Sequence, residues 1–203
     1  MHPNPLVRSE DRALLEALID EIGFGMVFMG TPDGPRVAHV PLLLDGAEGS
    51  GDTLRFHLAR GNALTRWLEG GTALVVVNGP EAYVSPRWYD DRAAVPTWDY
   101  LALEMEGRVR KMDADGLEAL LHALIERHEA RIADEPWRAD EIPPEVWRKL
   151  FGGIVGFEME VLAWRPTLKL SQKRSPEERL RIAEGLEATG SPALARLMRT
   201  LAP

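Results

Sequence analysis

The order of hydrophobic patterns along the chain constrains its fold more than any other sequence feature. Residues 54–59 alternate apolar and polar side chains, which is typical of a half-buried strand. Residues 72–77 form an unbroken apolar run that suits a central strand. Together with turn signals such as Thr31-Pro32-Asp33-Gly34, these patterns predict strands over residues 24–29, 37–44, 54–59, 72–77, 98–112 and 154–164. Pro166 is predicted to interrupt the last of them.

Helical patterns do not alternate regularly with these strands. A first helix is predicted to begin at an N-cap, Ser9, and to stop at Gly23. The other predicted helices cover residues 62–69, 113–132, 143–151 and the region after Ser175. A doubly wound parallel sheet would need regular alternation, so the sequence predicts a β-rich α+β fold, a small antiparallel barrel of about six strands flanked by helices. We expect one domain over residues 1–203, with a helical insertion at about 113–151 and a basic helical segment at about 176–203.

Composition narrows the class of protein and its compartment. With 45% hydrophobic and 28% charged residues among 203, the chain is typical of an ordinary globular protein. It has no apolar stretch long enough to span a membrane and no export signal, and it contains no cysteine. Disulfides, thiolate metal sites and a cysteine nucleophile are therefore excluded, and we expect a cytoplasmic protein without a membrane partner.

Charge is distributed unevenly along the chain. The net charge is −8, yet residues 164–203 hold eight Lys or Arg against four acidic residues. The acidic body argues against nucleic-acid binding through bulk electrostatics. The basic end suits either contact with an anionic ligand or a pair of solvated helices with mixed charges, and the sequence leaves both open.

Familiar catalytic motifs are absent, and the histidines do not form a metal site. The sequence contains no G-x-G-x-x-G, Walker-type, G-x-S-x-G or H-E-x-x-H pattern. His122 and His128 lie six positions apart on one predicted helix, so they point in different directions. His39 and His57 each fall in the middle of a predicted strand, where a structural histidine is the more frequent case.

Three segments carry residues suited to binding a ring system. Segments 79–89 and 95–100 are rich in Tyr and Trp, which offer flat apolar surfaces, although the same residues also pack barrel ends. Segment 168–174 (Leu-Lys-Leu-Ser-Gln-Lys-Arg) places three cations, a hydroxyl and an amide after a strand. This composition suits a phosphate or an electron-rich ring edge, and it is also compatible with a basic surface loop.

The joint order of these segments resembles the PaiB-type family of FMN-binding negative transcriptional regulators. The resemblance covers residues from about 5 to 188. It rests on segments 41–45, 57–62, 83–89, 95–100 and 169–172, of which Val-Pro-Thr-Trp (95–98) and Lys-Leu-Ser-Gln (169–172) are the most specific.

The resemblance implies a split-barrel fold that binds FMN, usually as a homodimer with the cofactor near the subunit interface. It also implies kinship with pyridoxamine-phosphate oxidases and a link to repression of sporulation and degradative-enzyme genes. From it we expect Arg60 or Lys169 to face the flavin phosphate and Trp98 to lie against the ring. The cofactor-binding residues carried over are His39, Arg60, Asn62, Tyr83, Ser85, Thr97, Trp98, Lys169, Ser171 and Gln172.

Three departures from the family pattern bear on this expectation. The family tends to have Glu-Gly-Lys shortly before the Lys-Leu-Ser-Gln segment, where this chain has Arg165-Pro166-Thr167. Asp99 and Lys173 stand where the family usually has Asn. If Asp99 faced the phosphate, its charge would weaken FMN binding.

Three functional readings follow from the sequence. The first is a flavin-binding regulator or sensor without a DNA-reading helix of its own, and the second is an FMN-dependent oxidoreductase acting on a small molecule or cofactor. The third is a dimer that has lost its ligand.

Overall fold

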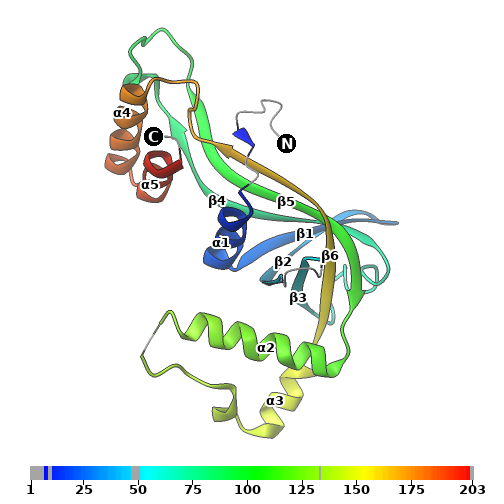
Figure 1. The fold of residues 1–203 in the computed structure, drawn as a ribbon. Helices are drawn as coiled ribbons and strands as arrows, with labels where there is room; N and C mark the ends of the chain where they lie inside the picture. Colours follow the sequence, from blue (N-terminus) through cyan, green and yellow to red (C-terminus); the bar gives the residue numbers. More distant parts are fainter. Residues whose placement is uncertain (1–6, 9–10, 47–50, 133, 202–203) are drawn as a thin grey trace. The chain divides into compact units, whose positions relative to one another are not determined.

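Six antiparallel strands close into a barrel in the order β1-β2-β3-β6-β5-β4 (Figure 1). The computed structural model describes residues 7–8, 11–46, 51–132 and 134–201. The predicted class, an antiparallel split barrel of about six strands with flanking helices, is confirmed. The strands are β1 Phe24–Thr31, β2 Gly34–Asp45, β3 Thr53–Ala59, β4 Thr72–Val84, β5 Thr97–Lys111 and β6 Ile154–Lys169.

The helices lie close to where the hydrophobic periodicity predicts them. They are α1 Arg12–Ile22, α2 Ala114–Glu129, α3 Pro144–Phe151, α4 Pro176–Ala188 and α5 Pro192–Leu201, with short 3-10 helices η2 Pro86–Trp88 and η3 Ala139–Glu141. Gly23 ends α1 with a φ of 60°, as the predicted stop requires. The predicted N-cap Ser9 lies outside the described residues. Ser175 caps α4 by accepting a hydrogen bond from the Glu178 N–H.

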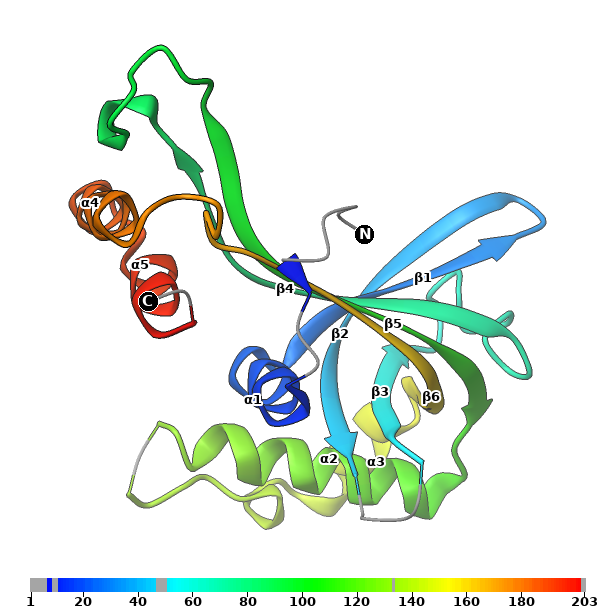
Figure 2. The ribbon, with the colours of Figure 1, turned by 45° about the horizontal axis from the view of Figure 1, so that its top comes forward.

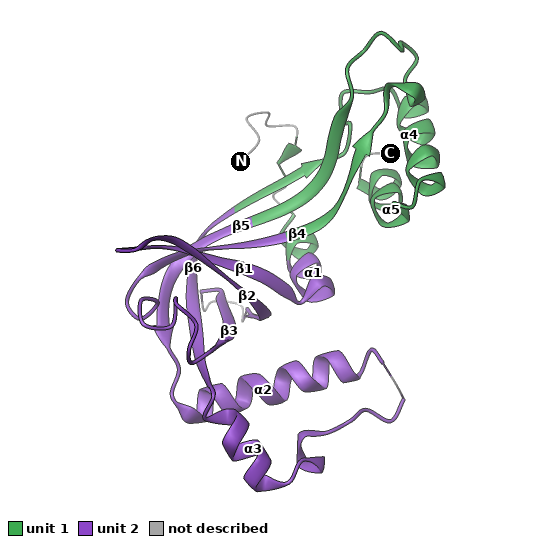
Figure 3. Ribbon diagram, turned by 180° about the vertical axis from the view of Figure 1, so that it is seen from behind, with its two compact units in different colours: residues 1–15, 78–103, 165–203 green, residues 16–77, 104–164 purple. Residues whose placement is uncertain are grey.

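The chain divides into two compact units (Figure 3). Unit 1 comprises residues 1–15, 78–103 and 165–203, and unit 2 comprises residues 16–77 and 104–164. The four divisions fall inside α1, β4, β5 and β6, so these elements contribute residues to both units. The prediction of a single domain over the whole chain stays a prediction.

Unit 2 holds the packed interior of the barrel. Phe56 on β3 and Phe157 on β6 are paired in register, and their stacked rings lie 5.9 Å apart. Both are fully buried, as the alternation in residues 54–59 predicts. Gly107 on β5 lets the backbones approach, because a Cβ at this position would lie 2.1 Å from the Glu160 carbonyl oxygen.

Helix α2 lies against β2 and β3 (Figure 2). Its buried residues Leu120 and Leu124 pack with Leu43 of β2 and with Met112, which follows β5. This apolar contact explains why the predicted insertion begins as a helix beside the barrel.

Two local predictions are wrong. Strand β6 continues through Pro166 to Lys169. Its pairing with β3 ends at Glu160, so Pro166 lies in a part of the strand that β3 does not pair, where a missing N–H is tolerated. Residues 62–69 form consecutive turns, with hydrogen bonds such as Thr65 N–H to the Asn62 carbonyl and Trp67 N–H to the Leu64 carbonyl, in place of the predicted helix.

Strand β4 is also longer than the apolar run 72–77 predicts. It extends to Val84 and includes Tyr83, which belongs to the aromatic-rich segment 79–89. Among the described residues, no helix is both long enough and apolar enough to cross a membrane.

Candidate functional site

The residues predicted to bind the cofactor fall into two groups, one in each unit. Tyr83, Ser85, Thr97, Trp98, Lys169, Ser171 and Gln172 belong to unit 1, and His39, Arg60 and Asn62 belong to unit 2. Each group is considered within its own unit.

Lys169 joins the end of β6 to the start of β5 in unit 1. Its Nζ lies 2.5 Å from the Thr97 Oγ1 and 3.4 Å from the Asp99 Oδ1, and it also donates to the Trp98 carbonyl. β5 and β6 are neighbours in the barrel, which brings together residues some seventy positions apart in the sequence. The two most specific motifs of the sequence are therefore in direct contact.

Asp99 is the fully buried centre of this contact. Its Oδ2 accepts a hydrogen bond of 2.6 Å from the Ser171 hydroxyl, and its other carboxylate oxygen faces the Lys169 ammonium. Burial raises the pKa of Asp99, and the hydrogen bond from Ser171 and the charge of Lys169 oppose that rise. The Asp99 charge is thus met by partners inside unit 1.

The turn after β6 holds Ser171 in an unusual backbone conformation. Ser171 has a φ of 54°, the left-handed region that costs a residue with a Cβ roughly 1–2 kcal/mol. Gln172 braces this turn, because its Oε1 accepts from the Leu170 N–H at 2.9 Å and its Nε2 donates to the Leu168 carbonyl. Backbone outliers of this kind persist where the surrounding structure enforces them, and they cluster at functional sites.

Two aromatic side chains are presented at the surface beside this cluster. The rings of Tyr83 and Trp98 meet edge to face at 6.3 Å, and they are 48% and 56% exposed. A cavity of about 460 Å³ adjoins Trp98 and is lined by Asn78, Gly79, Glu81, Trp98, Tyr100 and Leu101. Its size and its combination of aromatic and amide groups fit a planar heteroaromatic ring.

The remaining predicted residue of unit 1 has a structural contact. Ser85 caps η2, since its hydroxyl accepts from the Arg87 N–H at 3.2 Å.

The predicted residues of unit 2 contact backbone groups rather than one another. Arg60 donates from Nε to the Gly152 carbonyl at 2.8 Å and from Nη2 to the Ile154 carbonyl at 3.1 Å. The Asn62 side chain accepts from the Leu64 N–H at 2.9 Å. His39 is exposed on β2, opposite Met26 in register.

His57 lies inside strand β3, as the sequence predicts. Burial lowers its pKa, and its buried Nδ1 has no hydrogen-bond partner within the described part of the chain. The neutral imidazole is therefore the favoured form.

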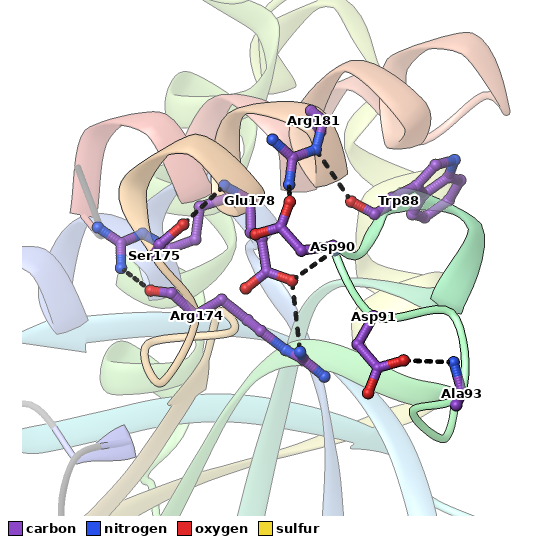
Figure 4. Close-up of polar contacts among 9 residues, drawn as sticks. Trp88, Asp90, Asp91, Ala93, Arg174, Ser175, Glu178 and Arg181 are labelled. Atoms are coloured by element: carbon purple, nitrogen blue, oxygen red, sulfur yellow. Dashed lines mark hydrogen bonds and ion pairs between the residues drawn. The ribbon is translucent and has the colours of Figure 1, made fainter.

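The basic C-terminal segment pairs largely with acids of its own unit. Arg174 contacts Glu178 at 3.4 Å, Arg181 pairs with Asp90 (Figure 4), and Arg199 pairs with Glu187 at 2.7 Å. These contacts favour the structural reading of its charge. They also reveal Glu178 as a buried acid that sequence reasoning did not assign to the site, because only burial distinguishes it from a solvated carboxylate.

Comparison with known families and proteins adds to this geometry. A family model described as "Putative FMN-binding domain" matches residues 1–163. "Protease synthase and sporulation protein PAI 2" of Bacillus subtilis (strain 168) is 32% identical over 177 residues, which cover 86% of this chain and 83% of that protein.

Solved structures share the fold at low sequence identity. The FAD and heme binding protein from Mycobacterium smegmatis superposes with a TM-score of 0.60 at 22% identity, covering 79% of this chain and 72% of that one. The flavocytochrome Anf3 from Azotobacter vinelandii gives the same TM-score at 13% identity, covering 83% and 72%. These similarities support the split-barrel architecture.

Proposed function

Since the chain belongs to the family of FMN-binding domains of the PaiB type, we propose that it binds FMN with the flavin ring against Trp98 and acts as a flavin-dependent regulator or sensor. The observation that carries the proposal is the exposed Trp98 ring, which lies beside a cavity of suitable size and belongs to a residue whose carbonyl accepts from Lys169. Bound flavin supplies reversible electron transfer, while the protein binds and orients it.

Lys169 serves the ring side of the site rather than the phosphate. An ammonium has three N–H donors. Three acceptors already surround the Lys169 Nζ, namely the Thr97 hydroxyl, the Trp98 carbonyl and the Asp99 carboxylate. A phosphate would have to displace one of these contacts, so we assign Lys169 to holding the start of β5 beside the ring.

Arg60, the other cation that the family resemblance expects at the phosphate, belongs to unit 2. Its guanidinium is exposed and has five N–H groups, of which the bonds to the Gly152 and Ile154 carbonyls engage Nε and Nη2. The same two bonds hold the side chain in one orientation, which suits bidentate recognition of a phosphate.

The regulatory role is supported by the Bacillus subtilis relative, whose name associates it with sporulation. We propose that the effect on gene expression is indirect, because the acidic net charge of −8 disfavours contact with DNA phosphates. A homodimer in the cytoplasm is part of the same proposal and rests on the family resemblance.

The decisive experiment is titration of the purified protein with FMN, in which quenching of flavin fluorescence measures binding. Wild type is expected to bind FMN and to turn yellow. Trp98→Ala should weaken binding about tenfold or more, because stacking of an aromatic ring on a planar base contributes about 1–3 kcal/mol.

A matched control comes from another partly exposed tryptophan. Trp137, which is 37% exposed, belongs to unit 2, and Trp137→Ala should leave FMN affinity unchanged. A colourless wild type that cannot be loaded with FMN would refute flavin binding, and equal loss in both variants would refute the role of Trp98.

A further inference from the structure

The loop between Tyr89 and Thr97 leads directly into the proposed flavin site, yet its own hydrogen bonds are local. The Ala93 N–H donates to the Asp91 side chain at 2.8 Å, and the Ala94 N–H donates to the Asp91 carbonyl at 3.3 Å. Val95 is 78% exposed. A segment with so little burial opens easily unless another element holds it.

Glu178 of α4 reaches this loop from a largely buried position. It is 8% exposed, and its Oε1 accepts a hydrogen bond of 2.9 Å from the Asp90 N–H (Figure 4). The same oxygen lies 3.4 Å from Nη1 of Arg174, whose guanidinium carbon lies 3.7 Å from the centre of the Tyr89 ring. A buried carboxylate thus connects the start of α4 to the start of the loop.

Two further contacts lie on the same face of α4. Arg181 pairs with the Asp90 carboxylate and donates from Nε to the Trp88 carbonyl at 3.4 Å. At Gly185 the helix touches the Trp88 ring so closely that a Cβ would lie 2.2 Å from it. Positions 178, 181 and 185 share one helix face, and that face is directed at residues 88–90.

The helix is also tied to the second motif of the site. The Arg174 N–H donates to the Ser171 carbonyl at 2.9 Å, in the turn that presents the Ser171 hydroxyl to Asp99. The residue before the α4 N-cap therefore contacts the Lys-Leu-Ser-Gln motif, and α4 itself contacts Trp88 and Asp90, although the helix lies beyond residue 163, where the match to the family model ends.

Stability alone does not explain the charged contacts. Helices α4 and α5 already pack through fully buried apolar residues such as Ile182, Leu186 and Leu194. The Arg181–Asp90 ion pair is largely exposed, and an exposed pair adds little net stability. The Glu178 hydrogen bond to the Asp90 N–H instead selects one position of the loop backbone. The conformation selected here is that of the loop.

We propose that Glu178 and Arg181 are positioning residues that hold loop 90–96 and thereby preform the Thr97–Trp98 wall of the flavin site. The inference rests on the proposed function, since it assigns α4 the task of setting FMN affinity. Neither residue is expected to touch the cofactor.

The test uses the full-length protein and two readouts. Trypsin cleavage after the exposed Arg92, mapped by mass spectrometry, reports opening of the loop without any flavin. FMN titration reports the site. We expect Glu178→Ala to raise the rate of cleavage at Arg92 about tenfold and to weaken FMN binding by a similar factor, because a charged hydrogen bond to the loop is lost.

Three variants separate positioning from general destabilisation. Glu178→Gln keeps an acceptor for the Asp90 N–H and should behave close to wild type. Asp90→Ala removes the Arg181 pair from the loop side without altering α4, and it should shift both readouts in the direction of Glu178→Ala. Glu187→Ala breaks the ion pair with Arg199 elsewhere on α4 and should change neither.

Each outcome decides the proposal. Unchanged cleavage in Glu178→Ala would overturn it, and so would faster cleavage with unchanged FMN affinity. Equal effects in Glu187→Ala would reduce Glu178 to a residue that merely stabilises the helix. If wild type binds no FMN, the proposed function fails, and so does the claim that the loop sets FMN affinity. The cleavage data would still show whether Glu178 holds the loop.

Discussion

At the scale of single residues, the central feature is the buried carboxylate of Asp99. Asp99 is shielded from solvent and shared between the Ser171 hydroxyl and the Lys169 ammonium. The charge that departs from the family pattern is therefore matched locally, and the structure suggests no need for it to face an anionic ligand.

Asp99 should make stability depend on pH in a definite direction. Burial raises its pKa above the ordinary value of 3.8, so the folded protein retains the proton to a higher pH than the unfolded chain does. This contribution to stability is present at low pH and is lost as the pH rises through the folded pKa.

The variant Asp99→Asn cannot titrate at this position. We therefore expect its melting temperature, relative to wild type, to increase steadily as the pH is raised above 3.8. Thermal unfolding of both proteins across the acidic to neutral range measures this difference. Parallel curves would show that Asp99 titrates normally in the folded state.

Lys169 and Arg60 can be distinguished with two ligands that differ only by a phosphate. Lys169→Ala should weaken FMN and riboflavin alike, because its ammonium is committed to Thr97, Trp98 and Asp99. If Arg60 faces the phosphate, as the family resemblance implies, Arg60→Ala should weaken FMN alone, about tenfold or more for a lost charge-assisted contact. An FMN-specific loss in Lys169→Ala would return the phosphate role to Lys169.

At the scale of secondary structure, the approach of β5 to β6 depends on a missing side chain. A Cβ on Gly107 would meet the Glu160 carbonyl oxygen at 2.1 Å, and this backbone atom cannot move without separating the strands. Gly107→Ala should lower the free energy of unfolding by about 1–3 kcal/mol or more.

The matched control for this substitution is Gly152→Ala, where a Cβ meets its nearest atoms at an ordinary 3.6 Å. Urea unfolding of both variants provides the comparison. A Gly107→Ala protein as stable as the control would mean that the strands separate at little cost.

Most helices and strands could be predicted because the sequence patterns that specify them involve residues close together in the chain. The alternation in residues 54–59 specifies β3, and Gly23 and Ser175 mark helix ends through backbone geometry and capping. The failures at Pro166 and at the far end of β4 share one cause. Strand length depends on which neighbours a strand pairs with, and such pairing is not local.

At the scale of the whole molecule, net charge limits the possible partners. The value of −8, together with the pairing of Arg174, Arg181 and Arg199 with acids, disfavours binding to a phosphate backbone. We expect no tight binding to duplex DNA in a fluorescence anisotropy titration at low salt. Nanomolar affinity with a steep salt dependence would instead establish direct DNA recognition.

A turnover assay on the purified protein distinguishes a flavin-based sensor from an enzyme. Turnover of NAD(P)H by the flavin-loaded protein in the presence of an electron acceptor would favour the oxidoreductase reading over the regulator. A flavin that is reduced only stoichiometrically would support the sensor.

The sequence alone determined the strand and helix pattern, the antiparallel class and the order of the motifs, because periodicity, capping and turn chemistry act between near neighbours. Only the tertiary structure decided that Lys169 and Ser171 surround a buried Asp99, and that Glu178 holds the Asp90 backbone. These contacts join segments some seventy to ninety residues apart. The pairing of distant strands and the burial that shifts a carboxyl pKa arise only when the whole chain packs.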